Sequence, residues 1–264
     1  MGEHTLSRIR GVLFDLDGTL YLGDEPIAGA AEAVEAARSR GIACRFVTNT
    51  STKSAITILE KMHRLGFAAE ASEIFTPSTA CVSFLREAGT PKVMLLLEPD
   101  AAEEFAEFER NDVEPDYIVI GDIGERWDYQ VLNSAFRAVQ KGARLLAYHK
   151  SRYYRGAGGM RLDAGPFVAA LEYAAGVEAT VLGKPTQTFF SLALRSLDLP
   201  PAEVATIGDD VENDVGGAQE AGMLGVLVRT GKYREEALQG SGVTPDVVAD
   251  SVAGLQALLT GASV

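Results

Sequence analysis

Two carboxylates stand two residues apart directly after an apolar run. Asp15 and Asp17 lie within the stretch Asp-Leu-Asp-Gly-Thr. In a continuing strand they share a face, and Gly18 lets the chain turn beside them. Two close carboxylates in a half-buried place repel each other unless a cation lies between them or one is protonated. The pair therefore suits a Mg²⁺ site, a general acid with a raised pKa, or both. Taken alone, the motif also fits an Asx-rich turn.

Two further motifs have the residue types that bind phosphate. Thr48 and Asn49 follow the second apolar run, where a hydroxyl and backbone N–H groups can hold phosphoryl oxygens. The same run of Thr, Asn and Ser is also typical of a helix N-cap. Lys184 stands between Gly183 and Pro185, and an ammonium in this place can neutralise a phosphate as a point charge. An ordinary surface turn is the alternative for Gly-Lys-Pro alone.

The fourth motif is an acidic segment that follows another apolar run. Asp209, Asp210, Glu212 and Asp214 are crowded within residues 208–214. Such a cluster at a strand end is costly without a cation, so it predicts a site for a hard metal ion. An acidic helix N-terminus, favoured by the helix dipole, is the alternative. Each motif is weak evidence alone, but four in this order, each at the end of a predicted strand, are hard to obtain by chance.

The elements that must position these motifs alternate along the chain, which predicts an α/β fold. The fold class we expect is a doubly wound, Rossmann-like parallel sheet core with an inserted α/β cap domain. In open sheets of this kind, ligands bind at the carboxyl ends of the strands. The predicted strands are residues 11–16, 42–47, 92–97, 117–121, 144–148, 204–207 and 226–228. The later predicted helices are residues 80–88, 101–109, 129–141, 166–175, 211–221 and 252–259, and a polar, aromatic loop is predicted for 149–163.

The positions of the motifs predict the domain organisation. All four motifs fall outside residues 79–179, yet their side chains must converge. We therefore expect a discontinuous core made of residues 1–78 plus 180–264, with residues 79–179 inserted as the cap.

Composition limits the partners of this chain of 264 residues. Its formal net charge is −13, which argues against a nucleic acid polymer as a partner. No run approaches the ~20 apolar residues of a membrane-spanning helix, so no membrane partner is expected. The N-terminal ten residues are polar, and Cys44 and Cys81 have neither metal nor redox spacing. These features favour a cytoplasmic protein.

The four motifs together resemble the haloacid dehalogenase superfamily of phosphotransferases. The resemblance covers essentially the whole chain. The long insert between the second and third motifs is similar to the α/β cap of subfamily IIA, which includes bacterial nucleotide and p-nitrophenyl phosphatases. The stretches at residues 149–154, 222–225 and 230–233 look most like two animal members of this family.

The resemblance implies a role for each motif. Asp15 is expected to be the nucleophile and a Mg²⁺ ligand. Asp17 is expected to act as general acid and then general base, and to bind Mg²⁺ through its backbone carbonyl. Thr48, Asn49 and Lys184 are expected to hold the phosphoryl oxygens of the substrate.

The resemblance also assigns the acidic segment. Asp209 is expected to be the third protein ligand of the metal. Asp214 is expected to support Lys184 and the metal without binding the metal directly. Asp210 is a weaker candidate for the same role.

The sequence thus predicts a Mg²⁺-dependent phosphohydrolase that acts on a small phosphorylated molecule through an aspartyl-phosphate. The alternative is a catalytically weak or non-catalytic relative that uses the fold for interaction. A phospho-receiver domain also uses strand-end aspartates, but it is a much shorter domain without the insert. Nucleotides, sugar phosphates, phosphoamino acids and pyrophosphate all remain open as substrates.

Selectivity and assembly are expected to depend on the cap. Arg152, Tyr153 and Tyr154 combine cationic and aromatic side chains that suit an anionic or ring-bearing leaving group. An exposed turn without function is the alternative. Family resemblance also suggests a homodimer through the cap.

Overall fold

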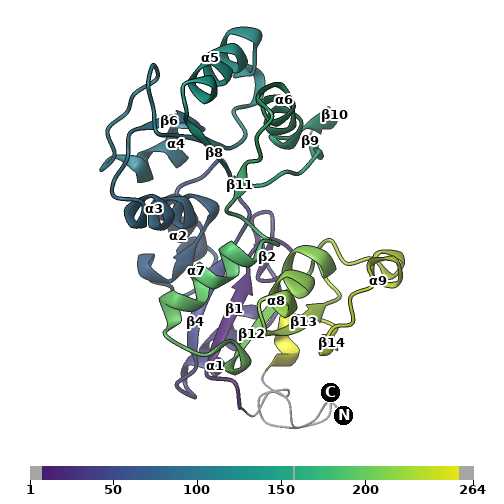
Figure 1. Cartoon of the computed structure of the whole chain (residues 1–264). Coiled ribbons are helices and arrows are strands. Elements are labelled where there is room, and N and C mark those ends of the chain that lie inside the picture. The colour runs from purple at the N-terminus through teal and green to yellow at the C-terminus, as the bar shows by residue number, and fades with distance from the viewer. Residues whose placement is uncertain (1–7, 157, 256–264) are drawn as a thin grey trace. The chain divides into compact units, whose positions relative to one another are not determined.

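The computed structural model describes residues 8–156 and 158–255 (Figure 1). The chain forms two compact units, and it passes from one to the other more than once. The first unit comprises the described residues within Met1–Thr48, Ile58–Phe75 and Lys184–Val264. The second comprises the described residues within Asn49–Thr57 and Thr76–Gly183.

The first unit contains a sheet of six parallel strands in the order β14-β13-β12-β1-β4-β5. From β1 the chain winds outward in one direction through β4 and β5. From β12 it winds in the other direction through β13 and β14. This is the doubly wound arrangement, and its direction changes between β1 and β12. The strands are β1 (Gly11–Asp15), β4 (Ala43–Val47), β5 (Ile74–Phe75), β12 (Val204–Gly208), β13 (Leu224–Val228) and β14 (Val247–Ala249).

The two central strands are buried along their whole length, because both faces of a parallel sheet are covered. This explains why β1 and β12 are continuous apolar runs without a polar alternation. Helices join successive strands. Thr186 caps the N-terminus of α7, because its hydroxyl accepts a hydrogen bond from the backbone N–H of Phe189 at 3.3 Å. The helices of this unit are α1 (Ala30–Arg38), α7 (Gln187–Leu197), α8 (Gly217–Glu220) and α9 (Glu235–Ser241), with α2 (Ala55–Arg64) beginning among residues of the second unit.

The second unit is built on four parallel strands in the order β11-β8-β7-β6. Its core is a cluster of aliphatic side chains from these strands and from α5 and α6. The strands are β6 (Val93–Leu96), β7 (Tyr117–Ile120), β8 (Arg144–Ala147) and β11 (Thr180–Val181). The helices are α3 (Pro77–Glu87), α4 (Pro99–Ala102), α5 (Tyr129–Gln140) and α6 (Gly165–Ala175).

The described residues also contain two short antiparallel hairpins outside the two parallel sheets. β2 (Tyr21–Leu22) pairs with β3 (Glu25–Pro26) directly after the first motif. β9 (Tyr153–Gly156) pairs with β10 (Gly159–Leu162) in the second unit. Single 3₁₀ turns occupy Ala71–Glu73, Glu103–Phe105, Gly124–Arg126, Pro201–Glu203 and Val252–Gly254.

The α/β fold class is confirmed, but several predicted elements were wrong in detail. The predicted loop 149–163 contains the β9–β10 hairpin, whose described side chains are exposed, so no buried alternation marks it in the sequence. The predicted helix 101–109 is only α4 followed by a 3₁₀ turn. The predicted helix 211–221 begins as a π-helix, Val211–Gly216, and continues as α8. The predicted helix 252–259 starts with a 3₁₀ turn, and its part beyond residue 255 lies outside the described residues.

Among residues 8–156 and 158–255, no helix has both the length and the apolar character needed to cross a bilayer.

Candidate active site

Three of the motifs meet at one edge of the six-stranded sheet. Asp15 is the last residue of β1 and lies opposite Val47, the last residue of β4. Thr48 follows β4 directly, and Asp209 follows the last residue of β12. Because these neighbouring strands are parallel, their carboxyl ends lie side by side. This edge is also where the strand order changes direction, the usual ligand site of such folds.

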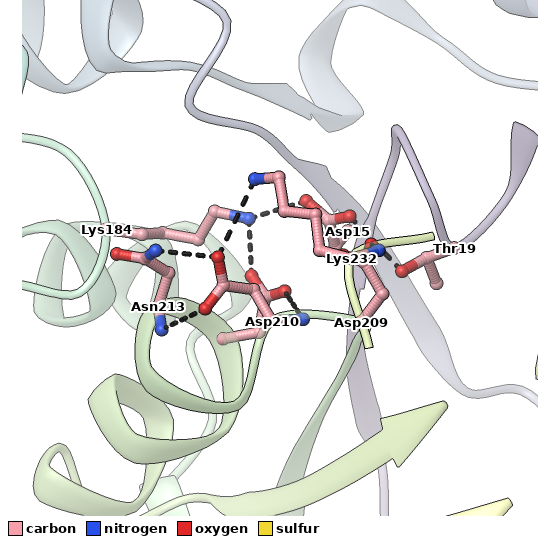
Figure 2. A network of polar contacts seen from close by, with 8 residues as sticks. Asp15, Thr19, Lys184, Asp209, Asp210, Asn213 and Lys232 are labelled. Atoms are coloured by element: carbon pink, nitrogen blue, oxygen red, sulfur yellow. Dashed lines mark hydrogen bonds and ion pairs between the residues drawn. The ribbon is translucent and has the colours of Figure 1, made fainter. Parts of the chain in front are cut away.

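Lys184 binds two carboxylates at this edge. Its Nζ lies 2.6 Å from Oδ1 of Asp15 (Figure 2). The same Nζ lies 2.6 Å from Oδ1 of Asp214. All three side chains are buried. The hydroxyl of Thr19 donates a hydrogen bond of 3.2 Å to Oδ2 of Asp15. Both oxygens of the Asp15 carboxylate are therefore fixed in position.

Charge and burial act in opposite directions on this group. Burial disfavours the ammonium of Lys184, but Asp15 and Asp214 outweigh that effect and raise its pKa. Burial also raises the pKa of Asp15, and the charge of Asp209 raises it further, while Lys184 lowers it. The lysine is thus held in its charged form by carboxylates that are themselves costly to ionise.

Among the residues that the structure describes, three buried carboxylates form a group that could hold a metal ion. Asp15, Asp209 and Asp214 each offer an oxygen, and these oxygens lie within 4.8 Å of one another. Burial raises the pKa of Asp209 and of Asp214 to about 6. One buried ammonium faces these three acids, so the cluster carries excess negative charge when all are ionised. A hard divalent cation such as Mg²⁺ fits this set of oxygen donors.

Two glycines make room for the Asp209 carboxylate. A Cβ at Gly18 or at Gly231 would lie 2.0 Å from Oδ2 of Asp209. Both glycines have a positive φ, +101° and +53°, which other residues rarely adopt. The backbone N–H of Lys232 donates to the same oxygen at 2.6 Å. Backbone from two loops therefore encloses this carboxylate.

Asp210 stabilises the loop that presents Asp214. Its carboxylate accepts the backbone N–H of Asn213 at 3.0 Å and the Asn213 amide at 2.8 Å (Figure 2). Although burial alone would raise its pKa, these two bonds lower the pKa of Asp210. The backbone N–H of Asp210 donates to Oδ2 of Asp214 at 3.1 Å. The π-helix that begins here thus orients Asp214 toward Lys184.

The other candidates from the first two motifs are placed differently. The side chain of Asp17 is exposed, and its Oδ1 accepts the backbone N–H of Gly23 at 3.4 Å. Its carboxylate therefore lies outside the buried acidic group. Thr48 is buried, and its backbone N–H donates to the carbonyl of Phe75 at 3.2 Å. Asn49 is half-buried and is the first residue of the second unit.

The three cap candidates belong to the second unit. Arg152, Tyr153 and Tyr154 are exposed and lie at the start of the β9–β10 hairpin. The guanidinium of Arg152 lies 5.8 Å from the centre of the Tyr153 ring, within range of a cation–π contact. The mixed cationic and aromatic character predicted for this segment is therefore present in one local contact.

Sequence reasoning missed two side chains of the site. Thr19, inside the first motif, was not assigned a role but holds Asp15. Lys232 was not a candidate, yet its Nζ lies 3.6 Å from Oδ2 of Asp210. The available signal was positional, because residues 230–232 follow the apolar strand β13 as the motifs follow theirs.

The fold and the site define an α/β protein whose acidic cluster and buried lysine meet at the carboxyl edge of a doubly wound sheet. Residues 12–110 match the family described as haloacid dehalogenase-like hydrolase, and residues 181–255 match the HAD-hydrolase-like family. The chain belongs to the haloacid dehalogenase-like hydrolases. The family predicted from the four motifs is thereby confirmed.

Relatives cover most of the chain. Haloacid dehalogenase-like hydrolase domain-containing protein 2 of Homo sapiens is 46% identical over 226 residues, 86% of each chain. Phospholysine phosphohistidine inorganic pyrophosphate phosphatase of Homo sapiens is 37% identical over 254 residues, 94% of this chain and 93% of the relative. These are the two animal proteins that residues 149–154, 222–225 and 230–233 resemble.

A solved structure agrees with these relatives. The p-nitrophenyl phosphatase from Archaeoglobus fulgidus superimposes with a TM-score of 0.88 and 29% identity, covering 94% of this chain and 98% of that one. It and the second animal relative have phosphatase names, which supports the prediction of a phosphatase of the hydrolase class.

The raised pKa of Asp209 predicts a pH-dependent stability in EDTA-treated protein. Because its pKa is raised from 3.8 to about 6, the folded state binds this proton more tightly than the unfolded chain. That stabilisation is fully present below about pH 4 and is lost as the pH rises through about 6. Asp209→Asn cannot ionise, so between pH 5 and 8 it should gain about 1–3 kcal/mol relative to wild type. Urea unfolding at several pH values measures this gain.

Asp210→Asn is the matched control, because the pKa of Asp210 is lowered. Its ionised form contributes stability above the unfolded pKa, so this variant should be less stable than wild type throughout the neutral range. A constant difference between Asp209→Asn and wild type across the same range would contradict the assignment.

Proposed function

We propose that this protein is a Mg²⁺-dependent phosphohydrolase that acts on a small phosphorylated substrate through an aspartyl-phosphate on Asp15. The observation that carries the proposal is the buried contact of Lys184 with Asp15 beside Asp209 and Asp214. This arrangement fixes one carboxylate oxygen of Asp15 with a cation and places further oxygen donors beside it. Phosphoryl transfer needs such positioning and charge neutralisation more than covalent assistance.

In the proposed reaction, an oxygen of Asp15 attacks phosphorus and the bond from phosphorus to the leaving oxygen breaks. Asp17 donates a proton to the leaving oxygen. It then takes a proton from the water that attacks the aspartyl-phosphate, which releases inorganic phosphate and restores Asp15. Lys184, Thr48 and Asn49 hold the phosphoryl oxygens during both steps.

Mg²⁺ would be held by the carboxylates of Asp15 and Asp209 and by the backbone carbonyl of Asp17. When bound, it would neutralise negative charge on the transferred group. Asp214 is buried and shares Lys184 with Asp15, so it would keep the lysine in place and add negative charge near the metal. Asp210 would help to position Asp214, because its backbone N–H donates a hydrogen bond to Oδ2 of Asp214.

We propose a class of substrates, small molecules that carry a phosphoryl group. The relatives' names include phospholysine, phosphohistidine, inorganic pyrophosphate and p-nitrophenyl phosphate. We extend the same chemical range to this chain, with nucleotides and sugar phosphates as further members. The competing function is a non-catalytic interaction protein, and the buried lysine and carboxylates argue against it, since such a costly site needs a role.

We further propose that residues 79–179 act as a cap over a core of residues 1–78 plus 180–264. Selectivity would depend on Arg152, Tyr153 and Tyr154 of this cap, and a homodimer would form through it. We also propose a cytoplasmic location without membrane or nucleic acid partners, and the net charge of −13 supports the absence of a nucleic acid polymer.

The metal assignment predicts how turnover responds to Mg²⁺. Wild type should release p-nitrophenolate from p-nitrophenyl phosphate with Mg²⁺ and stop when EDTA is added. Asp209→Asn should raise the Mg²⁺ concentration for half-maximal rate by at least about tenfold, because a ligand oxygen loses its charge. Glu212 is an exposed acid in the π-helix that follows, so Glu212→Gln is the matched control and should behave as wild type. Unchanged Mg²⁺ dependence in Asp209→Asn would contradict the assignment.

Asp15→Asn and Asp17→Asn should stop the reaction at different steps. Asp15→Asn removes the attacking oxygen, so no covalent intermediate forms and turnover vanishes. Asp17→Asn keeps the nucleophile but lacks the base that activates water. With p-nitrophenyl phosphate, whose leaving group needs little protonation, the intermediate should form and persist. Rapid acid quench and intact mass measurement should show a phosphate adduct on Asp17→Asn alone, and equal adducts on both variants would reverse the roles.

The cap proposal predicts a change in selectivity. Replacing Arg152, Tyr153 and Tyr154 together with alanine should alter the ratios of kcat/KM among esters, phosphoramidates and pyrophosphate by about tenfold. Met160 and Leu162 are exposed on the paired strand β10, so their double alanine variant is a matched control. A uniform effect across the substrates would instead indicate an exposed turn without a part in recognition.

A further inference from the structure

Lys232 interacts with the acidic site through both its backbone and its side chain. Its N–H donates to Oδ2 of Asp209 at 2.6 Å, which fixes the position of the residue. Its ammonium extends toward Asp210, with 3.6 Å between Nζ and Oδ2 (Figure 2). The charge of Lys232 also interacts with Asp15 and Asp214. The side chain thus belongs to the electrostatics of the site, although none of the four motifs includes it.

The ion pair between Lys232 and Asp210 is weak. The distance of 3.6 Å exceeds a hydrogen bond, and the lysine side chain is 71% exposed. Exposed pairs of this kind contribute little stability. Asp210 also has its two bonds from Asn213, so it does not depend on the lysine. The ammonium can therefore turn to another anion at small cost.

Lys184 and Lys232 differ in what they can bind. Lys184 is buried between Asp15 and Asp214 and has no freedom to follow a substrate. Lys232 lies on the exposed side, on a flexible four-carbon stem. A group that reaches Lys232 is therefore one that extends outward from the transferred phosphoryl group.

The charge of the site indicates which leaving groups Lys232 would bind. The carboxylates of the described site interact with two ammonium groups, those of Lys184 and Lys232. Four carboxylates take part, Asp15, Asp209, Asp210 and Asp214, so even with a divalent cation these groups carry no net positive charge. A neutral leaving group adds no further charge. A leaving group with its own phosphate adds negative charge at the exposed side, where Lys232 is the cation that the described site provides.

We propose that Lys232 forms an outer anion subsite that recognises a second phosphate joined to the one that is transferred. The inference rests on the proposed function and narrows it, since it favours phosphoanhydrides, with inorganic pyrophosphate as the simplest, over esters with a neutral leaving group. Lys232 acts here in substrate selection, while Lys184 serves the transferred group.

Lys232→Met tests the subsite, because methionine retains much of the stem and the backbone N–H that binds Asp209. Inorganic pyrophosphate is measured as a substrate and as an inhibitor of p-nitrophenyl phosphate hydrolysis, at fixed free Mg²⁺. The variant should weaken KM or the inhibition constant for pyrophosphate by about tenfold, while KM for p-nitrophenyl phosphate changes less than about twofold. Lys232→Arg should recover most of the loss, and added salt should shrink the difference.

Arg10→Met is the matched control for the loss of one positive charge. Arg10 precedes β1, at the opposite end of the strand from Asp15, and its guanidinium pairs with Glu203 at 2.8 Å. This variant should bind both compounds as wild type does. Equal losses for pyrophosphate and p-nitrophenyl phosphate in Lys232→Met, or no loss for pyrophosphate, would overturn the inference. A wild-type protein that hydrolyses neither compound would instead overturn the proposed function.

Discussion

The rest of the site depends on one buried contact, the ammonium of Lys184 between the carboxylates of Asp15 and Asp214. The lysine is 4% exposed, so the loss of either carboxylate takes an anionic partner away from a buried ammonium. Removing one partner of a buried ion pair typically costs about 3–5 kcal/mol. The contact also joins residues far apart in the chain, since Lys184 is 169 positions from Asp15 and 30 from Asp214. It can form only when both halves of the sheet are assembled.

Topology explains why these distant residues meet. The chain enters the sheet at β1 and returns beside it at β12, so Asp15 at the end of β1 lies near Asp209, which follows β12 directly. The π-helix after β12 then turns Asp214 back toward Lys184, and Asp210 fixes that turn through Asn213. π-helical turns are rare and often occur at functional sites. The burial of β1 and β12 on both faces provides a rigid base for this arrangement.

The sequence predicted the buried elements of the fold well and the exposed ones poorly, because burial leaves a pattern of apolar residues. Buried parallel strands are apolar runs, so β1, β4 and β12 were predicted within two residues of their ends. The motifs that follow them were found because strand ends carry ligands in such sheets. The β9–β10 hairpin is exposed and lacks that signal.

Lys232 was missed for a different reason. The stretch 230–233 carried only a family resemblance and no chemical role, and the contact of Lys232 with Asp210 bridges segments that only the folded sheet brings together. The same holds for Gly231, whose small size matters only because the Asp209 carboxylate lies where a side chain would be. Local sequence shows which residues can do chemistry, but it does not show which residues must leave space for them.

The excess negative charge of the site explains its remaining features. Burial and mutual repulsion keep the pKa of Asp209 and Asp214 near 6, so the ionised cluster is costly without a cation. A fold tolerates such a cost where function requires it and where the surrounding core is stable enough to bear it. The two lysines relieve the cost differently, since buried Lys184 is part of the folded structure while exposed Lys232 can exchange one anion for another. The same electrostatic imbalance that makes the ionised cluster costly therefore favours the binding of a cation beside these carboxylates.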